Sequence, residues 1–350
     1  MSREDLVEVQ EQEDIEIEGP EGNTINENID AIEDEEGNLL AGEEAPTAPQ
    51  DNFYANLAEF LDDSQLKSLA SKLLADFKDD SLARKSYIET YTKGLDLLGF
   101  KYQEVTRPFI GASGVTHPLL AEAATQFQAQ AFKELLPSDG PVRCQVVGAE
   151  SKETIQQANR VRDYMNYQIT DVMEEYTPEM DQMLFFLPLA GSTFKKVYYD
   201  PAAQRCKATF IHAEDLVVPY NASDLYEAER ISEVQRVTKN TVAKRIASGF
   251  YRDVELPEPF FNEDRAQKKY QELEGVTPQK YQDLYNFVEM HVDLDLPGYE
   301  SNDGVKVPYI VTLDRDSMTI MSIYRNYKPN DPSRKRIPYF VHYKFLPGLG

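Results

Sequence analysis

The chain has 350 residues, of which 41% are hydrophobic, and its net charge at pH 7 is −25. That length and that apolar fraction exclude a wholly disordered chain and predict one large domain or two smaller ones. The acidic balance excludes a protein that wraps duplex DNA by neutralising phosphates, because that mode of binding needs clusters of Lys and Arg.

Residues 1–50 are predicted to be a disordered acidic arm. They hold 17 acidic residues against one basic residue, Arg3, which gives a net charge of −16. Their Val and Ile residues are isolated, so the segment cannot bury enough apolar surface to offset its chain entropy. A solvated tail is the favoured interpretation, and a dock for a basic partner is the alternative.

Residues 51–190 are predicted to be mainly helical, because apolar residues recur there at helical spacing. The expected helices are Phe53 to Phe77 (one bent helix or two short ones), Ser81 to Leu98, Pro118 to about Leu136, Ile155 to Tyr176, and Pro178 into Phe186. A short strand is expected around Arg143 to Val147, after the break marked by Pro137, Gly140 and Pro141.

Residues 191–350 are predicted to be sheet-rich, because the apolar period beyond Gly191 becomes strand-like. Strands are expected at Phe194 to Tyr199, Ala208 to His212 and Leu216 to Val218, and helices at Thr241 to Phe250 and Asn262 to Glu274. Four further segments should form an antiparallel meander: Phe287 to Leu294, Val305 to Leu313, Thr319 to Tyr324 and Tyr339 to Lys344. The fold class is therefore α+β, with helices first and an antiparallel sheet-rich part second.

Neither the cysteines nor the apolar stretches point to an extracellular or membrane protein. Cys144 and Cys206 form no CxxC pair, which favours a reducing cytoplasm without a disulfide framework or a zinc site. The longest apolar stretch, Leu184 to Ala190, is too short to span a bilayer, and the first residues lack the pattern of a signal peptide. We expect synthesis in the cytoplasm and no membrane partner.

The candidate catalytic motifs have better structural explanations. The turn at Gly111 to Gly114 resembles a nucleophile elbow only superficially, because its glycine spacing is not that of GxSxG and Pro108 breaks the strand that should precede it. No Lys follows as in a P-loop. A tight turn that presents a helix N-terminus is favoured, so we predict no catalytic residue and no enzyme.

Two acidic clusters with a histidine could in principle bind a metal. Glu289, His291 and Asp293 alternate along one expected strand and share a face, which is more simply explained as the wet face of a half-buried sheet. The cluster of His212, Glu214 and Asp215 is better explained by turn chemistry, with Asp215 capping a backbone amide. His117 and His342 stand alone and are expected to be packed or capping residues. No metal and no cofactor is predicted.

The densest basic run of the C-terminal part is Arg334, Lys335 and Arg336. A nucleic-acid patch is one interpretation of such a run. In an acidic homo-oligomer, we instead expect these residues to form a subunit interface with carboxylates of the adjacent copy.

Three runs, in this order, carry a resemblance to a known family: TRPFIGASGVTHPLLAEA (Thr106 to Ala123), LPLAGSTFKKVYYDP (Leu187 to Pro201) and RIPYFVHYKFLPGLG (Arg336 to Gly350). Together with HAEDLVVPYNASDL (His212 to Leu225), they resemble signature stretches of portal proteins, the head-to-tail connectors of tailed double-stranded DNA phages, especially short-tailed ones. The resemblance extends from about residue 85 to the end of the chain. It implies a wing-like α+β fold and a structural role.

The resemblance also implies partners and a location. Portal subunits form a homo-oligomeric ring, commonly of twelve copies, at one capsid vertex of the virion, where they contact the major capsid protein. The ring is the conduit for genome packaging and DNA ejection, and it docks the terminase first and adaptor or tail proteins afterwards. Double-stranded DNA passes through without specific binding. We expect these residues to be the N-terminal portion of a longer subunit; the alternatives are an acidic cytoplasmic enzyme and a monomeric scaffold or adaptor.

Overall fold

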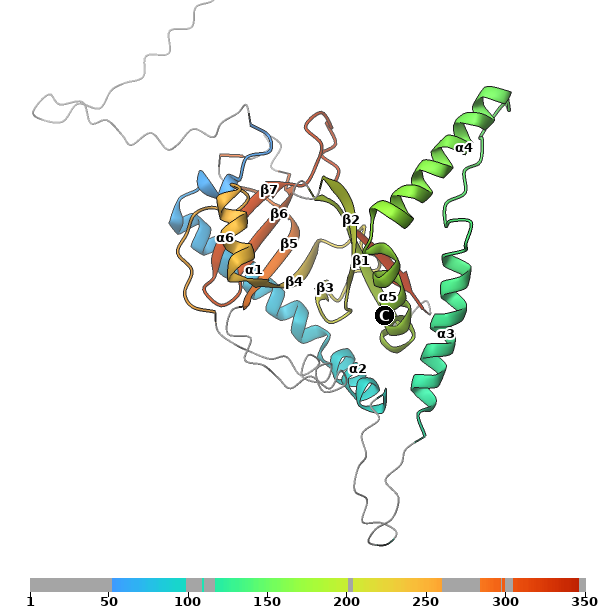
Figure 1. The fold of residues 1–350 in the computed structure, drawn as a ribbon. Coiled ribbons are helices and arrows are strands. Elements are labelled where there is room, and N and C mark those ends of the chain that lie inside the picture. The colour runs from blue at the N-terminus through green and yellow to red at the C-terminus, as the bar shows by residue number, and fades with distance from the viewer. Residues whose placement is uncertain are drawn as a thin grey trace, which may run out of the picture. The chain divides into compact units, whose positions relative to one another are not determined.

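The computed structural model describes residues 52–98, 109, 117–200, 204–259, 284–296, 298–299 and 305–345. Helices come first along the chain and two antiparallel sheets follow (Figure 1), which confirms the predicted α+β class. Within these ranges no helix has both the length and the apolar character needed to cross a membrane. The predicted acidic arm, the turn at Gly111 to Gly114 and the predicted helix from Asn262 to Glu274 lie outside the described residues.

The first helices are a short 3-10 turn, η1 (Leu57–Glu59), followed by α1 (Asp63–Ala83) and α2 (Lys85–Leu98). The expected break at Asp62 to Ser64 is the start of α1, where the Asp62 backbone N–H donates to the Gln65 side chain as in a capping box. The buried residues of α1 are Leu66, Ala70, Leu73, Phe77 and Asp80. Their spacing of three or four residues places one face of α1 against the larger sheet.

The next helices are α3 (Leu119–Leu135), α4 (Lys152–Tyr167) and α5 (Tyr176–Ala190). The α-helical part of the predicted helix from Ile155 to Tyr176 ends earlier, at Tyr167, and a π-helical turn, η2 (Gln168–Val172), follows it. α3 packs against α5 in an apolar cluster that includes Phe127, Met183 and Leu187. In Figure 1, α4 extends away from the strands of both sheets.

The predicted strand around Arg143 to Val147 is not formed, and this prediction was wrong. Its alternation is real, because the half-buried Val142, Cys144 and Val146 are each followed by an exposed residue. The backbone of Val142 is paired by the Asn166 side chain of α4, at 2.8 Å through its N–H and 3.3 Å through its carbonyl. Packing beside a helix therefore produced a pattern that is usually typical of a strand.

The larger sheet has the order β3-β4-β5-β6-β7, and all its neighbours are antiparallel. Its strands are β3 (Leu216–Val217), β4 (Arg230–Thr238), β5 (Leu284–Leu294), β6 (Val307–Asp314) and β7 (Thr319–Arg325). The sequence did not predict β4, because Arg230, Glu233 and Arg236 interrupt its apolar pattern. Thr238 caps α6 (Lys239–Ala247), which follows β4 directly.

The smaller sheet has the order β2-β1-β8, built from β1 (Ser192–Asp200), β2 (Arg205–Ile211) and β8 (Phe340–Lys344). The predicted meander is therefore wrong in its last strand: β8 pairs with β1, from Ser192↔Lys344 to Lys196↔Phe340, and not with β7. The connection over residues 326–339 is much longer than the two to five residues of an ordinary hairpin loop. It carries the chain to the second sheet.

The two sheets share an apolar core. Phe194 of β1, Ile231 of β4 and Phe340 of β8 belong to one buried cluster, together with Leu95 of α2. The facing strands therefore come close enough for polar side chains to bond from one sheet to the other.

Candidate functional site

A cluster of polar side chains lies where the two sheets meet, and we call it the inter-sheet cluster. Its members are Lys196 of β1, Glu233 and Gln235 of β4, Glu289 and His291 of β5, and Asn326 after β7. The side chains of Lys196, Glu233 and Glu289 are 11%, 11% and 15% exposed. Charges this far from water need partners, and the cluster supplies them.

Lys196 is the centre of the inter-sheet cluster. Its Nζ donates to Glu233 Oε2 and to Glu289 Oε1, each at 2.6 Å, and the Gln235 amide donates to both carboxylates at 3.0 and 2.9 Å. Burial alone would lower the pKa of Lys196, but the two carboxylates outweigh it and raise that pKa above its usual value. The ammonium therefore stays charged and joins β1 to both β4 and β5.

The two carboxylates that share Lys196 differ in how readily they ionise. Burial opposes ionisation of Glu289, yet Lys196 and His291 hold its pKa well below the usual range. Burial, reinforced by the charge of Glu289, raises the pKa of Glu233 despite Lys196. One lysine and one firmly ionised carboxylate thus form the ionic centre of the cluster.

His291 is held between a carboxylate and an amide. Its Nε2 lies 2.9 Å from Glu289 Oε1, and its Nδ1 lies 3.3 Å from Asn326 Nδ2. The neutral ring with its hydrogen on Nε2 satisfies both contacts, donating to Glu289 and accepting from Asn326. The residue is 1% exposed and its ring packs on Phe340, with centroids 4.8 Å apart. Burial lowers its pKa, so the ring is neutral at pH 7.

The predicted wet face of β5 is largely buried, and this expectation was wrong. Glu289, His291 and Asp293 do share one face, but the smaller sheet covers the first two and only Asp293 remains substantially exposed. The opposite face carries Val288 and Met290, which are packed in the core that includes α1. β5 is thus covered on both sides, a condition that its own sequence does not reveal.

The predicted basic run is divided between contacts within the chain and solvent. Arg336 donates to Asp293 Oδ1 at 2.8 Å and to the carbonyl oxygens of Ala228 and Glu229 at 2.6 and 3.0 Å, so its guanidinium is engaged within its own chain. Arg334 and Lys335 are exposed. That all three contact an adjacent copy stays a prediction.

The adjacent lysines of the run LPLAGSTFKKVYYDP point to opposite faces of β1. Lys196 enters the inter-sheet cluster, whereas Lys195 is directed toward α5, with its Nζ 4.4 Å from the centre of the Tyr176 ring and 3.5 Å from the Tyr176 carbonyl oxygen. Burial lowers the pKa of Lys195 to about 8. Both lysines of this run therefore have a structural role in holding other elements to β1.

Other predicted site residues are also used in packing. Asp215 pairs with Arg236, at 2.8 and 3.2 Å, instead of capping a backbone amide as predicted. His342 stacks on Phe194 and lies 3.1 Å from Ser192 Oγ, so it is a packed histidine as expected. His212 packs against Phe210. His117, which was expected to be a packed or capping residue, is exposed.

The three runs that carry the family resemblance meet in one place. Leu120 of the first run, Phe194 of the second and Phe340 of the third belong to the same apolar cluster. Phe345 of the third run also packs edge-on against Phe127 of α3, with ring centroids 5.1 Å apart. The described residues of these runs pack together around the smaller sheet.

The inter-sheet cluster is suited to holding strands together. Its charges are paired with one another, and its histidine is neutral and held from both sides. In the part of the chain that the structure describes, no group of three or more His, Cys, Asp or Glu side chains is placed to hold a metal ion. Comparison of the sequence with known protein families and with curated proteins found no match.

Proposed function

We propose that this chain is a structural subunit of a portal ring, the conduit through which double-stranded DNA enters and leaves the capsid of a tailed phage. The observation that carries the proposal is the meeting of the three portal-like runs in one apolar cluster, at Leu120, Phe194 and Phe340. Segments so far apart in the sequence that pack together act as parts of one unit. A shared structural role explains why all three resemble the same family.

The charge of the chain supports a role as a conduit. A net charge of −25 repels the phosphates of duplex DNA, and repulsion at short range keeps a passing polyanion from adhering. A wall of identical acidic subunits would let DNA move in either direction. The terminase would supply the force by ATP hydrolysis while docked on the ring, and adaptor or tail proteins would replace it after packaging.

A ring of identical subunits needs a contact between two different surfaces of the same chain, and it closes when the rotation between neighbours completes a circle. The exposed Arg334 and Lys335 provide one positively charged surface for such a contact. Carboxylates of the adjacent copy, in a chain this acidic, provide the complementary charge.

Negative-stain electron microscopy and mass photometry of the complete gene product test the proposal. We expect closed rings with a central hole and a mass near that of twelve copies. Lone copies at all concentrations would favour the monomeric scaffold instead. In a parallel measurement, fluorescence anisotropy with labelled duplex DNA should detect no complex that persists at high ionic strength.

A further inference from the structure

The chain between α4 and α5 leaves the α-helical hydrogen-bonding pattern at η2. The Met173 N–H donates to the carbonyl oxygen of Gln168, five residues earlier, at 2.9 Å, which makes the turn π-helical. The Thr170 hydroxyl donates to the Asn166 carbonyl oxygen, also at 2.9 Å. A hydroxyl bonded to the preceding turn bends a helix, and a single π-helical turn is a rare interruption that is often found at functional sites. η2 thus separates α4 from α5.

The firmly anchored part of the chain begins at η2. Arg205 of β2 donates to the carbonyl oxygen of Val172 at 2.9 Å and forms an ion pair with Glu175 at 2.5 Å. Met173 is 8% exposed, and α5 then buries five of its residues. The residues that follow η2 are therefore held to the smaller sheet by both polar and apolar contacts.

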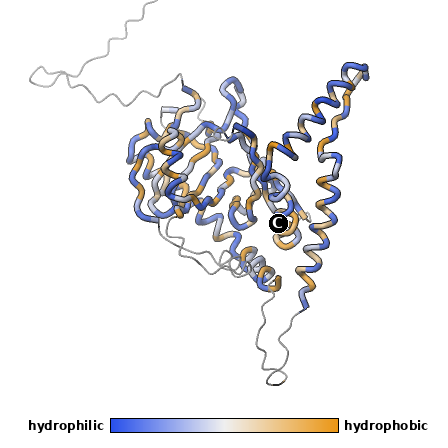
Figure 2. Tube along the Cα trace, in the orientation of Figure 1, coloured by the Kyte–Doolittle hydropathy of each residue, from blue (hydrophilic) through white to orange (hydrophobic). Residues whose placement is uncertain are grey.

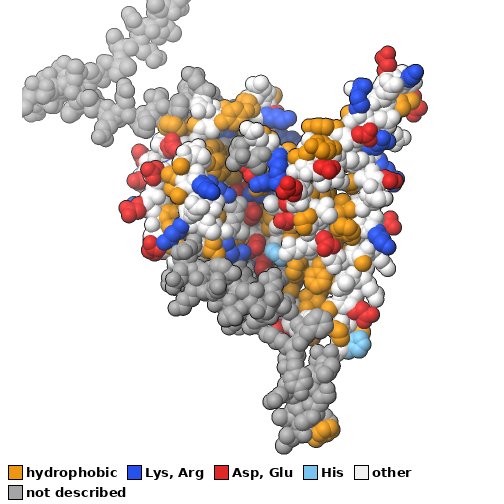
Figure 3. All heavy atoms as spheres, in the orientation of Figure 1, with side chains coloured by type: hydrophobic (Ala, Val, Ile, Leu, Met, Phe, Trp, Pro, Cys, Tyr) orange, Lys and Arg blue, Asp and Glu red, His pale blue; other side chains and the backbone are white. Residues whose placement is uncertain are grey.

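α4, which precedes η2, has no such anchors. None of its residues is buried. Figure 2 shows a mostly hydrophilic helix with scattered hydrophobic positions, and Figure 3 shows charged side chains of both signs along it. The capping box between Ser151 and Thr154 fixes where the helix begins but makes only local bonds. Low burial of this kind is characteristic of segments that move independently of the core.

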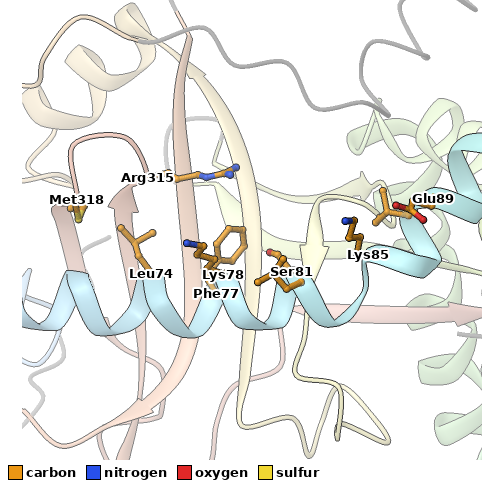
Figure 4. Close-up of a pocket in the computed structure, with 10 residues that line it drawn as sticks. Leu74, Phe77, Lys78, Ser81, Lys85, Glu89, Arg315 and Met318 are labelled. Carbon is orange, nitrogen blue, oxygen red and sulfur yellow. The ribbon is translucent and has the colours of Figure 1, made fainter.

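α1 shows how an anchored helix differs. Leu74 and Phe77 point from α1 toward the turn between β6 and β7, which carries Arg315 (Figure 4). Phe77 is 5% exposed, and the Arg315 guanidinium lies 5.8 Å from the centre of its ring. Asp80 adds two hydrogen bonds from Arg230 of β4. Buried apolar and charged side chains thus hold α1 to its sheet, and α4 has no buried side chain of either kind.

α4 and residues 143–151, which we call the α4 arm, have a second connection to the rest of the chain. It is the segment 137–142 after α3. Gly140 in this segment has φ +91°, and a Cβ at this position would lie 2.4 Å from Asn166 Cγ. The Val142 N–H donates to Asn166 Oδ1 at 2.8 Å, and the Val142 carbonyl oxygen accepts from Nδ2 at 3.3 Å. Asn166 lies in the last turn of α4, just before η2. Both connections of the arm therefore meet at this one side chain.

We propose that η2 and residues 137–142 form a hinge about which the α4 arm turns relative to α5 and β2, with Asn166 as the latch that holds one position. A hinge consists of a few residues at the ends of elements that absorb changes in φ and ψ, and the two connections lie side by side, as a single axis requires. The 16 residues of α4 span about 24 Å, so a turn of about 15° moves Lys152 by roughly 6 Å. The inference concerns contacts within one chain, so it goes beyond the proposed ring.

Spin labels measure this movement in the complete gene product. These residues contain two cysteines, Cys144 and Cys206. With Cys144 replaced by Ser, Cys206 of β2 is labelled together with Lys152→Cys at the far end of the arm. Labelled copies are diluted with unlabelled ones, so that each distance measured by pulsed electron paramagnetic resonance belongs to one chain. The control pair is Cys206 with Lys72→Cys on the exposed face of α1, which should give one narrow distance in every variant.

Two variants release the latch by different routes. Asn166→Ala removes both bonds to Val142, and Gly140→Ala pushes the Asn166 side chain away from them. Each should raise the share of copies with a displaced arm roughly fivefold or more, because these bonds stabilise only the latched position. Asn159→Ala, at an exposed residue of α4, is the matched control and should leave the distances unchanged. Distances between Lys152→Cys and Cys206 that change in neither latch variant would overturn the proposal.

Hydrogen exchange distinguishes an arm that turns intact from one that unfolds. The backbone amides of residues 152–163 should exchange at the same rate in Asn166→Ala and in the parent, whereas those of residues 168–173 should exchange faster in the variant. Circular dichroism should show the same helix content in both. Faster exchange throughout residues 152–163 would mean that α4 melts when the latch is removed, and that result would also overturn the hinge.

Discussion

Lys196 of β1 donates a 2.6 Å hydrogen bond to Glu289 of β5, although 93 residues separate the two in the sequence. The bond joins one sheet to the other, and Glu233 of β4 shares the same ammonium. Its surroundings are apolar, with the Lys196 ammonium 5.7 Å from the centre of the Phe340 ring. In such surroundings a charge without its partner is strongly unfavourable, which makes the pairing necessary once the groups are buried.

Replacement of Lys196 should destabilise the protein severely. Lys196→Met keeps the aliphatic volume but leaves Glu233 and Glu289 without their cation, so we expect the free energy of unfolding to fall by about 3 to 5 kcal/mol. Chemical denaturation at pH 7 measures it. The control is Lys72→Met on the exposed face of α1, which should change the free energy of unfolding by less than about 0.5 kcal/mol.

A double variant tests whether the bond couples the two sheets. In Lys196→Met with Glu289→Met, the loss in the free energy of unfolding should be smaller than the sum of the two single losses. Additive losses would show that the bond does not couple the sheets.

Stability should depend on the protonation of His291. Its pKa is lowered in the folded protein, so below pH 6.5 the unfolded chain binds a proton that the folded chain does not. The contribution of His291 to the free energy of unfolding is therefore fully present above pH 6.5. It falls as the pH drops below that value, by up to about 1.4 kcal/mol per pH unit for this one group. Denaturation curves from pH 5 to 8 should show this slope in the parent protein.

The histidine that causes this slope can be identified by substitution. His291→Gln should flatten the pH dependence and lower the stability at pH 7.5, because the bonds to Glu289 and Asn326 are perturbed. The half-buried His212 and His342, whose pKa values desolvation also lowers, remain and leave a residual slope. His117→Gln, at an exposed residue, is the control and should keep the full slope. An equal slope in His291→Gln and the parent would exclude His291 as the titrating group.

The pair of Asp80 and Arg230 should anchor α1 to β4. Arg230 donates two hydrogen bonds to Asp80, at 2.6 and 2.9 Å, and the Asp80 carboxylate is buried. Asp80→Asn removes one charge of a bidentate pair, so we expect a loss of about 2 kcal/mol in the free energy of unfolding. Asp79→Asn changes the exposed neighbouring carboxylate and serves as the matched control. Similar losses in both variants would mean that the total charge of α1, and not this pair, is responsible.

Gly140 should resist substitution more than other glycines in the left-handed region. Its φ is +91°, and an added Cβ would lie 2.4 Å from Asn166 Cγ, which must then move away from its bonds with Val142. Gly249 has φ +73° but open space around it. Gly140→Ala should therefore lower the free energy of unfolding by about 2 kcal/mol and Gly249→Ala by about 1 kcal/mol. Thermal unfolding measures both losses. Equal losses would show that the Asn166 side chain moves away from the added Cβ at no cost in free energy.

Local patterns were sufficient for most helices and strands. α3, α5 and β5 have strong apolar spacing, or clear start and stop residues such as Pro137 and Gly191, and their positions follow from the sequence within a few residues. Gly191, at φ +76°, ends α5 in the left-handed conformation that glycine adopts readily. Such signals depend only on neighbours in the chain.

The pairing of segments that are distant in the sequence could not be predicted from local patterns. β4 was missed because Glu233 and Arg236 look like surface residues until Lys196 and Asp215, from distant segments, are placed beside them. The burial of His291 likewise depends on β8, whose pairing with β1 no local pattern specifies. Of the inter-sheet cluster, only Glu289 and His291 were therefore singled out in advance, as part of a wet row, and their meeting with Lys196 was not predicted.

The pairing of β1 with β8 has a consequence during synthesis of the chain. At roughly 5 to 20 residues per second, the ribosome needs about 8 to 30 seconds to translate from Ser192 to its strand partner Lys344. Throughout that interval the nascent β1 has no neighbour on that edge, and Lys196 is without the cover that Phe340 later provides. The newly made protein thus depends on β8, which is translated long after β1, to exclude water from that lysine, and a chaperone that shields β1 until then would raise the yield of folded protein.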